Sequence, residues 1–134
     1  MLLHSRPVDE DAHETFLIGF YSSHQKAQDV IERYKNIDGF RNHPKDFAIE
    51  EWEVDVDDFN RQGGDYNGKV FYLAHEYYDG TEYDYVTKIG VYSKRQNAKK
   101  ALSKYKGLPD FKEHADGFTI DEYDIDEDNW TQGF

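Results

Sequence analysis

Two acidic runs are the parts of this sequence whose residue types and spacing could do chemistry. They lie within residues 50–58 and 121–128, and in both runs carboxylates alternate with other side chains. Alternating carboxylates suggest a calcium site, because Ca²⁺ prefers oxygen ligands. The candidate binding residues are these carboxylates and one nearby tryptophan: Glu50, Glu51, Glu53, Asp55, Asp57, Asp58, Asp121, Glu122, Asp124, Asp126, Glu127, Asp128 and Trp130.

The calcium interpretation fails at the level of the motif. An EF-hand loop requires Gly at its sixth position and Glu at its twelfth. Counted from Asp55, these positions hold Asn60 and Tyr66. Counted from Asp124, the sixth position holds Asn129, and the sequence stops before the twelfth. We therefore predict no metal ligands and no cofactor, while weak binding of a divalent ion stays open. A charged edge strand that resists edge-to-edge pairing explains the runs without any ligand.

The sequence offers no constellation of residues for catalysis. Paired carboxylates serve in glycoside hydrolysis, but nothing distinguishes one acid in these runs from its neighbours. The chain has no cysteine, no nucleophile-elbow serine and no glycine-rich phosphate loop. Histidines recur at positions 4/75 and 43/114 without the spacing of zinc ligands. We predict a protein without catalytic residues that is not an enzyme; a carboxylate enzyme with a divalent metal is the least favoured alternative.

An excess of negative charge dominates the composition. The 134 residues include 16 Lys and Arg against 28 Asp and Glu, a formal net charge of −12 at pH 7. Such a field repels nucleic acid and anionic membranes and speeds encounter with basic partners, although net charge also serves solubility alone. The stretch Lys94–Lys106 differs, with six cations and no acid. We expect these cations to face acids of the same protein or solvent.

Several absences bear on the compartment. No apolar run approaches the length of a membrane span, and the first residues lack the pattern of a signal peptide. The lack of cysteine is compatible with a reducing environment. We predict a cytoplasmic protein with no nucleic-acid or membrane partner.

An internal repeat organises the chain. Residues 1–59 align without a gap on residues 72–130, at an offset of 71 positions and with seventeen identities. Duplication of a small domain explains this pattern. We expect a first repeat at 1–59, a short Gly-rich connector at 60–69 and a second repeat at 70–134, both forming one compact domain.

Each repeat is predicted to contain three strands. They are residues 2–4, 15–21 and 47–54 in the first repeat, and residues 70–77, 85–92 and 118–125 in the second. Gly19 and Gly90 lie inside the second strands, which suggests a bulge or the close approach of another backbone. The third strands change their apolar face midway. Either a bulge near Glu50–Glu51 restores one buried face, or the second half leaves its sheet and packs on the other repeat.

An amphipathic helix is predicted between the second and third strands. The apolar stripes are Ala27, Val30, Ile31, Tyr34 and Ile37 in the first repeat and Ala98, Ala101, Leu102, Tyr105 and Leu108 in the second. Ser22 and Ser93 each precede a Gln by three residues, the pattern of a capping box, so we expect both serines to be N-caps. Stop signals lie at residues 38–39 and 107–109.

These elements define the expected fold class, which is α+β. We predict two tandem β-β-α-β repeats related by pseudo-twofold symmetry, with mainly antiparallel sheet structure covered by two main helices.

The second repeat carries a recognisable pattern. From Ile89 to Phe134 it reads I-G-V-Y-S … G-F-x-I-D-E-Y … W-T-x-G-F. This pattern resembles a family of small, uncharacterised bacterial domains whose members usually carry the unit once. The first repeat lacks the W-T-x-G-F ending. The resemblance implies no activity and no catalytic residue. In size and acidity the chain is similar to immunity proteins that neutralise bacterial toxins, an analogy of type and not of motif.

The leading functional hypothesis is an acidic, non-enzymatic binding protein. Its concrete form is an immunity-type inhibitor whose acidic strands and exposed aromatic residues block a basic cleft of a partner such as a bacterial toxin. The alternative is a self-associating structural or regulatory module, a monomer or weak homo-oligomer in which the basic helix meets acidic strands of another copy.

Overall fold

The computed structural model describes residues 1–7, 13–37, 40–41, 45–78 and 84–129. The chain divides into two compact units whose boundaries differ from those of the sequence repeats. Unit 1 comprises Met1–Glu51 together with Asp124–Phe134, and unit 2 comprises Trp52–Tyr123. Each unit therefore combines the body of one repeat with the end of the third-strand region of the other.

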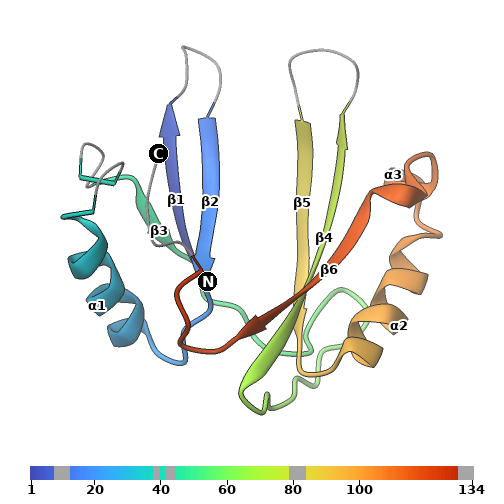
Figure 1. The fold of residues 1–134 in the computed structure, drawn as a ribbon. Coiled ribbons are helices and arrows are strands. Elements are labelled where there is room, and N and C mark those ends of the chain that lie inside the picture. The colour runs from blue at the N-terminus through green and yellow to red at the C-terminus, as the bar shows by residue number, and fades with distance from the viewer. Residues whose placement is uncertain (8–12, 38–39, 42–44, 79–83, 130–134) are drawn as a thin grey trace. The chain divides into compact units, whose positions relative to one another are not determined.

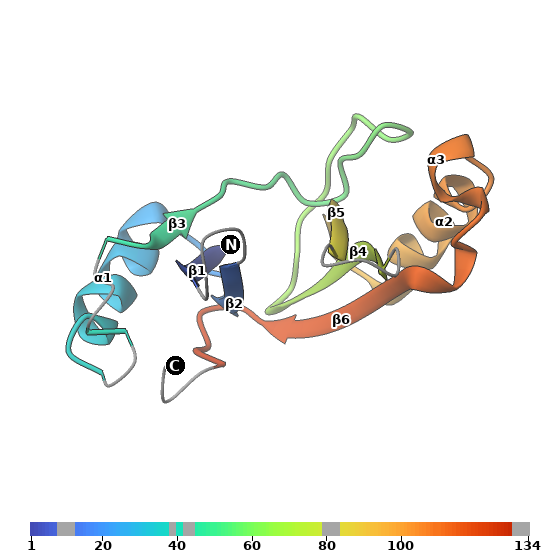
Figure 2. The same ribbon diagram turned by 90° about the horizontal axis from the view of Figure 1, so that it is seen from above.

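Unit 1 contains a three-stranded sheet and one helix (Figure 1). Its elements are β1 (Leu2–Pro7), β2 (His13–Gly19), α1 (His24–Tyr34) and β3 (Phe47–Ile49). The strand order is β2-β1-β3, and β1 pairs antiparallel with both neighbours. The helix lies against one face of this sheet, as both views show (Figures 1 and 2).

Unit 2 repeats this arrangement. Its elements are β4 (Lys69–Tyr78), β5 (Asp84–Tyr92), α2 (Arg95–Tyr105), α3 (Pro109–Lys112), the 3₁₀ helix η1 (Ala115–Gly117) and β6 (Phe118–Asp124). The strand order β5-β4-β6 is equivalent to that of unit 1. The predicted α+β class is confirmed, with two three-stranded antiparallel sheets and two main helices. The segment expected to be a connector contains no helix or strand between residues 60 and 68 and belongs to unit 2.

The cores lie between each helix and its own sheet, and every residue of the unit 1 cluster has its equivalent in the larger cluster of unit 2. Unit 1 buries Leu2, Ile18, Val30, Tyr34 and Phe40, and unit 2 buries Phe71, Leu73, Ile89, Tyr92, Ala98, Ala101, Tyr105 and Phe111. The helical stripes read from the sequence thus face the core as predicted. Full burial of one such aliphatic or aromatic side chain contributes about 1.5–3 kcal/mol, so these clusters hold each unit together.

The repeated histidines of the first strands are core residues. His75 packs edge-on against Phe111 and Phe118 with ring centroids 4.8 and 4.6 Å apart, and its Nε2 lies 2.7 Å from the backbone oxygen of His114. His4 makes the equivalent edge contacts, at 4.8 Å with Phe40 and 4.6 Å with Phe47. Their recurrence therefore has a packing explanation.

Gly19 and Gly90 each lie at a β-bulge, and at each of them another group approaches the backbone closely. Pairing shifts between Leu73 and Ala74, opposite Gly90, and the equivalent shift occurs in β1 opposite Gly19. A Cβ on Gly90 would lie 2.8 Å from the hydroxyl of Tyr92, because this side chain folds back over the glycine. A Cβ on Gly19 would lie 2.5 Å from the backbone oxygen of Glu127.

The predicted helix caps were wrong by one residue. The N-cap of α1 is Ser23, whose hydroxyl accepts a hydrogen bond from the amide of Lys26 at 3.2 Å. The N-cap of α2 is Lys94, which makes no side-chain capping bond. Ser22 and Ser93 do not cap these helices because carboxylates distant in the sequence take up their hydroxyl and amide groups.

The third strands end earlier than predicted, at Ile49 and Asp124, and the structure shows the second of the two alternatives for the residues that follow. β3 ends at Ile49, and beyond it Val54 forms a parallel bridge with Val91 of unit 2. Ile125 forms the equivalent bridge with Phe20 of unit 1, so the segment leaves its own sheet and packs on the body of the other repeat. Pro109 begins α3, as its fixed φ allows. The predicted stop signal at residues 38–39 lies outside the described residues.

Candidate functional site

The two acidic runs end in segments that we call arms. The first arm, residues 52–58, belongs to unit 2, and the second arm, residues 124–129, belongs to unit 1. Asp55 in the first arm and Asp126 in the second occupy equivalent positions and have φ values of 61° and 64°. Asp tolerates this left-handed region better than most residues, and the resulting bend turns each carboxylate back toward the chain.

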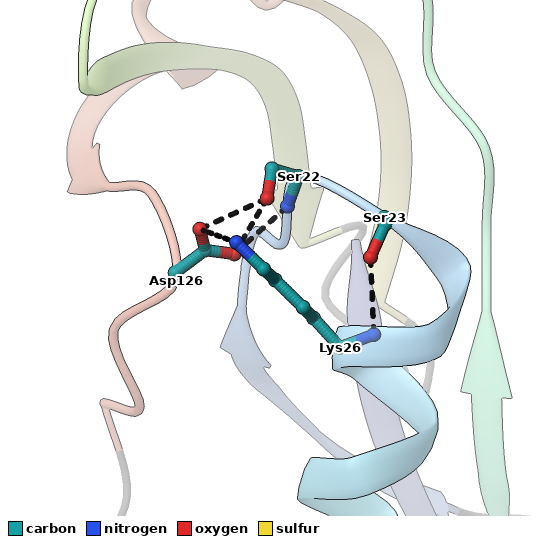
Figure 3. A network of polar contacts seen from close by, with 4 residues as sticks. All are labelled: Ser22, Ser23, Lys26 and Asp126. Carbon is teal, nitrogen blue, oxygen red and sulfur yellow. Dashed lines mark hydrogen bonds and ion pairs between the residues drawn. The ribbon is translucent and has the colours of Figure 1, made fainter.

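The second arm is anchored at the start of α1 (Figure 3). The carboxylate of Asp126 accepts hydrogen bonds from the amide and the hydroxyl of Ser22, both at 2.9 Å, and forms an ion pair at 3.0 Å with the ammonium group of Lys26. One side chain thus engages the backbone, a hydroxyl and a cation.

A second carboxylate fastens the same arm. Asp128 accepts a hydrogen bond at 2.5 Å from the hydroxyl of Tyr21 and forms an ion pair at 2.7 Å with Arg33. Beyond it, the amide of Asn129 donates to the backbone oxygen of Ile18 at 2.9 Å. The second arm is therefore held by ion pairs of its two carboxylates with α1 and by a backbone hydrogen bond to β2.

The first arm is anchored in the same way but without cations. Asp55 accepts hydrogen bonds from the amide and hydroxyl of Ser93 at 2.9 and 2.6 Å, with the amide group of Asn97 at 3.4 Å. Asp57 accepts a bond at 2.5 Å from the hydroxyl of Tyr92. The amides following Asp57, at positions 59 and 60, donate to its other oxygen at 2.7 and 2.9 Å.

Ionisation of these anchors follows from their contacts. Burial, and then the hydrogen bond to Asp128, raises the pKa of Tyr21 far above its ordinary value, and Tyr92 is shifted likewise by burial and by Asp57. Partial burial acts to raise the pKa of Asp126, but bonds from Ser22 and Lys26 outweigh it and lower the pKa below the ordinary 3.8. At neutral pH the phenols of Tyr21 and Tyr92 are therefore neutral, and the carboxylate of Asp126 is charged.

We expect Asp126→Asn to lower the free energy of unfolding at neutral pH by about 1 kcal/mol, a value that allows for solvent screening of this partly exposed group. The folded pKa lies below the unfolded one, so the carboxylate stabilises the fold above about pH 4 and loses this effect as pH falls through the folded pKa. Urea unfolding should show the difference from wild type narrowing between about pH 7 and about pH 3. Glu127→Gln, an exposed neighbour, is the control; a difference that does not change with pH would contradict the anchor.

The structure divides the predicted site residues into two groups. Asp55, Asp57, Asp126 and Asp128 anchor the arms within the units. The other carboxylates are exposed or half-buried: Glu50, Glu51, Glu53, Asp58, Asp121, Glu122, Asp124 and Glu127. Asp58 lies 3.9 Å from Arg61, and Glu122 lies 3.8 Å from Lys69. Trp130 lies outside the described residues.

Sequence reasoning missed the residues that receive the arms. Ser22, Tyr21 and their equivalents Ser93 and Tyr92 are identical in the two repeats, as are the four anchoring aspartates. Because the serine, the tyrosine and the aspartates all recur in both repeats, this pattern could have identified the residues that receive the arms. Lys26 and Arg33 carried no such signal, because the second repeat has Asn97 and Lys104 in their places.

Unit 2 also contains a pocket of about 400 Å³ beside its arm. One wall holds Asp55, Asp57 and Phe59, and the α2 wall holds Asn97, Lys100 and Lys104. Its volume is in the range of small-molecule sites. Sequence analysis did not predict this pocket, because its two walls come from different repeats.

The described residues offer no cluster of metal ligands and no helix that could span a membrane. No group of three or more His, Asp or Glu side chains there is arranged to hold a metal ion. None of the helices in the described ranges has both the length and the apolar character needed to cross a membrane.

Comparison with known proteins identifies the family. The family described as "Domain of unknown function (DUF7336)" matches residues 2–62 and again residues 68–134. No match to the chain was found among curated proteins or among solved structures. The chain belongs to this family and carries its domain twice in tandem, which confirms the predicted duplication within an uncharacterised family.

Proposed function

We propose that this tandem member of the family is a non-enzymatic protein that binds a basic protein partner through its acidic surface. Its best-fitting form is an immunity-type inhibitor that occupies the basic cleft of a toxin such as a nuclease. Localisation in the cytoplasm, where such an inhibitor would meet its target, is part of the proposal.

The observation that carries the proposal is the surplus of carboxylates that remains after the anchors are accounted for. Unit 1 has 14 acidic and 6 basic residues, and two of the six cations, Lys26 and Arg33, are already paired with the second arm. The exposed acids Glu51 and Glu127 therefore lie in a strongly negative unit. Such a field accelerates association with a basic partner and makes binding sensitive to salt.

The anchors change how this function must be tested. Reversing the charge of Asp126 or Asp128 would release the second arm, so a loss of binding would not distinguish a damaged fold from a lost contact. The exposed acids Glu51, Glu127 and Asp121 allow a cleaner test because, among the described residues, their side chains take part in no hydrogen bond and no ion pair.

We predict that the triple variant Glu51→Lys/Asp121→Lys/Glu127→Lys binds its partner at least about tenfold more weakly than wild type, mainly through a slower association rate. The partner is first captured from a lysate of the source organism at low ionic strength, then produced separately, and its affinity is measured at low and high salt. Affinity of the wild type should fall as salt increases.

Lys99→Glu is the matched control, since it changes an exposed cation of α2 to an acid and should leave the affinity unchanged or raise it. A captured partner with an acidic surface, or equal affinity for wild type and triple variant, would contradict the proposal.

A specific observation favours self-association as the second candidate. None of the cations on α2 forms an ion pair with a residue in the described ranges, although Arg95 lies over the ring of Phe71 at 5.2 Å. Of the two expected arrangements, pairing with acids of the same protein or exposure to solvent, the first is not found among the described residues, and the cations of α2 are exposed. Acids of a second copy could meet them. Light scattering at low and high salt separates the candidates, because a monomer under both conditions rules out self-association.

A further inference from the structure

The two units treat their arm carboxylates differently. In unit 1 the ammonium of Lys26 and the guanidinium of Arg33 lie on Asp126 and Asp128, at 3.0 and 2.7 Å. Each carboxylate there has a cation supplied by α1. Unit 1 therefore shows that an anchoring carboxylate forms an ion pair with an ammonium or guanidinium group when one lies within reach.

Unit 2 lacks these internal cations. The equivalent of Lys26 is Asn97, which is neutral, and the equivalent of Arg33 is Lys104, whose ammonium lies 5.6 Å from the centre of the Phe59 ring. Asp55 and Asp57 are only 6% and 9% exposed and accept hydrogen bonds from uncharged donors. No described residue forms an ion pair with either carboxylate.

The pocket of unit 2 lies beside Asn97, the residue that takes the place of Lys26. Replacing a lysine by the shorter Asn97 leaves space beside Asp55, and both residues line the cavity of about 400 Å³. Buried carboxylates are stabilised by a nearby positive charge, so an ammonium group entering this space would take the role that Lys26 has in unit 1.

The α2 wall carries two lysines that form no ion pair among the described residues. Lys100 and Lys104 lie one helical turn apart on the face of α2 that lines the pocket. The equivalent of Lys100 in unit 1 is Asp29, so a cation has replaced an acid at this position. Within the described residues neither lysine forms an ion pair.

We propose that this pocket binds a small zwitterion of amino-acid size, with its ammonium group at Asp55 and Asp57 and its carboxylate at Lys100 and Lys104. The ring of Phe59, which is 43% exposed, provides an apolar wall for the part of the ligand between the two charges. This site is separate from the exposed acids of the proposed partner surface.

A ligand with one charge fits the pocket less well. A simple amine would compete with the two flexible lysines for the carboxylates, and a simple carboxylate would compete with the two aspartates for the lysines. Only a molecule with both charges satisfies both walls at once, and for this reason the proposal specifies a zwitterion.

Three compounds with the same carbon chain test the proposal on the full chain. They are 6-aminohexanoate, with both charges, hexylamine, with the cation alone, and hexanoate, with the anion alone. Amide chemical shifts are followed by NMR during titration with each compound. We expect 6-aminohexanoate to bind about tenfold more tightly than either of the others, with shifts at Asn97 and Lys100.

Two variants separate the walls of the pocket. Asn97→Lys restores the internal cation of unit 1 and should abolish binding of 6-aminohexanoate while the protein stays folded. Lys100→Gln should weaken the binding of 6-aminohexanoate about fivefold, whereas the binding of hexylamine, which loses a competing cation, should not weaken. Lys99→Gln, on the same helix but not in the pocket, is the matched control and should bind as wild type does.

Four outcomes would overturn the proposal. They are the absence of shifts with 6-aminohexanoate, equal affinity for hexylamine, equal affinity for hexanoate, and retention of binding by Asn97→Lys. The first would show that the pocket takes no such ligand. The second and third would identify a site for a cation alone or an anion alone. The partner-binding experiment is independent of all four.

Discussion

Asp57→Ala is expected to lower the free energy of unfolding by about 3 kcal/mol, because it removes the acceptor of three hydrogen bonds from a buried place. The hydroxyl of Tyr92 and the amides of Phe59 and Asn60 all donate to this carboxylate, which is 9% exposed. Each donor left without a partner loses the compensation for its desolvation. Urea unfolding followed by circular dichroism measures the change.

The neighbouring acid provides the control for this prediction. Asp58 has a side chain that is 76% exposed, and its nearest cation, Arg61, is 3.9 Å away. Asp58→Ala should therefore change stability by less than about 0.5 kcal/mol. Similar losses from Asp57→Ala and Asp58→Ala would show that the first arm is not held by its buried carboxylate. Hydrogen exchange at the amides of residues 59 and 60 should accelerate in the first variant only.

Gly117→Ala is expected to destabilise unit 2 by about 2–3 kcal/mol through overpacking. A Cβ at this position would lie 2.3 Å from the backbone oxygen of Glu76 and 3.0 Å from Nε2 of His75. The backbone of β4 cannot move away without disturbing the pairing of the central strand. The contact with His75 would also displace a buried ring that packs against Phe111. Thermal and urea unfolding both report the loss.

Gly107→Ala is the matched substitution in the same unit. A Cβ there would have as its nearest neighbour the backbone oxygen of Lys104 at 3.8 Å, an ordinary contact. We expect a neutral effect or a gain of about 0.5 kcal/mol from the reduced freedom of the unfolded chain. If Gly117→Ala is as stable as Gly107→Ala, the close packing of η1 on β4 does not constrain this position.

Local pattern was sufficient to predict the secondary structure and the duplication. The helical stripes from Ala27 and from Ala98 face the two cores, and the strands before them pair as expected. These features depend on periodicity within some ten residues, which the sequence displays directly. The short helix α3 was missed because Pro109 indicates the end of one helix as readily as the start of another.

Contacts between distant parts of the chain account for what could not be predicted. Ser22 has the local pattern of an N-cap, but Asp126, 104 residues away, takes its amide and hydroxyl. No local pattern shows which of several carboxylates will make such a contact. Acids of the same run also differ in burial, since Asp57 is buried while the adjacent Asp58 is exposed. The pocket of unit 2 depends on the same exchange of arms and was equally hidden.

The division of the chain into units has a consequence for the order in which the protein is made. Unit 2 is one continuous segment, Trp52–Tyr123, whereas unit 1 needs both Met1–Glu51 and the segment that begins at Asp124. During synthesis on the ribosome, all of unit 2 emerges before the second arm does. Domains generally fold as units while the chain emerges, so unit 2 can complete its fold first. Met1–Glu51 can make its contacts with Asp126 and Asp128 only after those residues have been synthesised. We therefore expect unit 1 to complete its fold after unit 2.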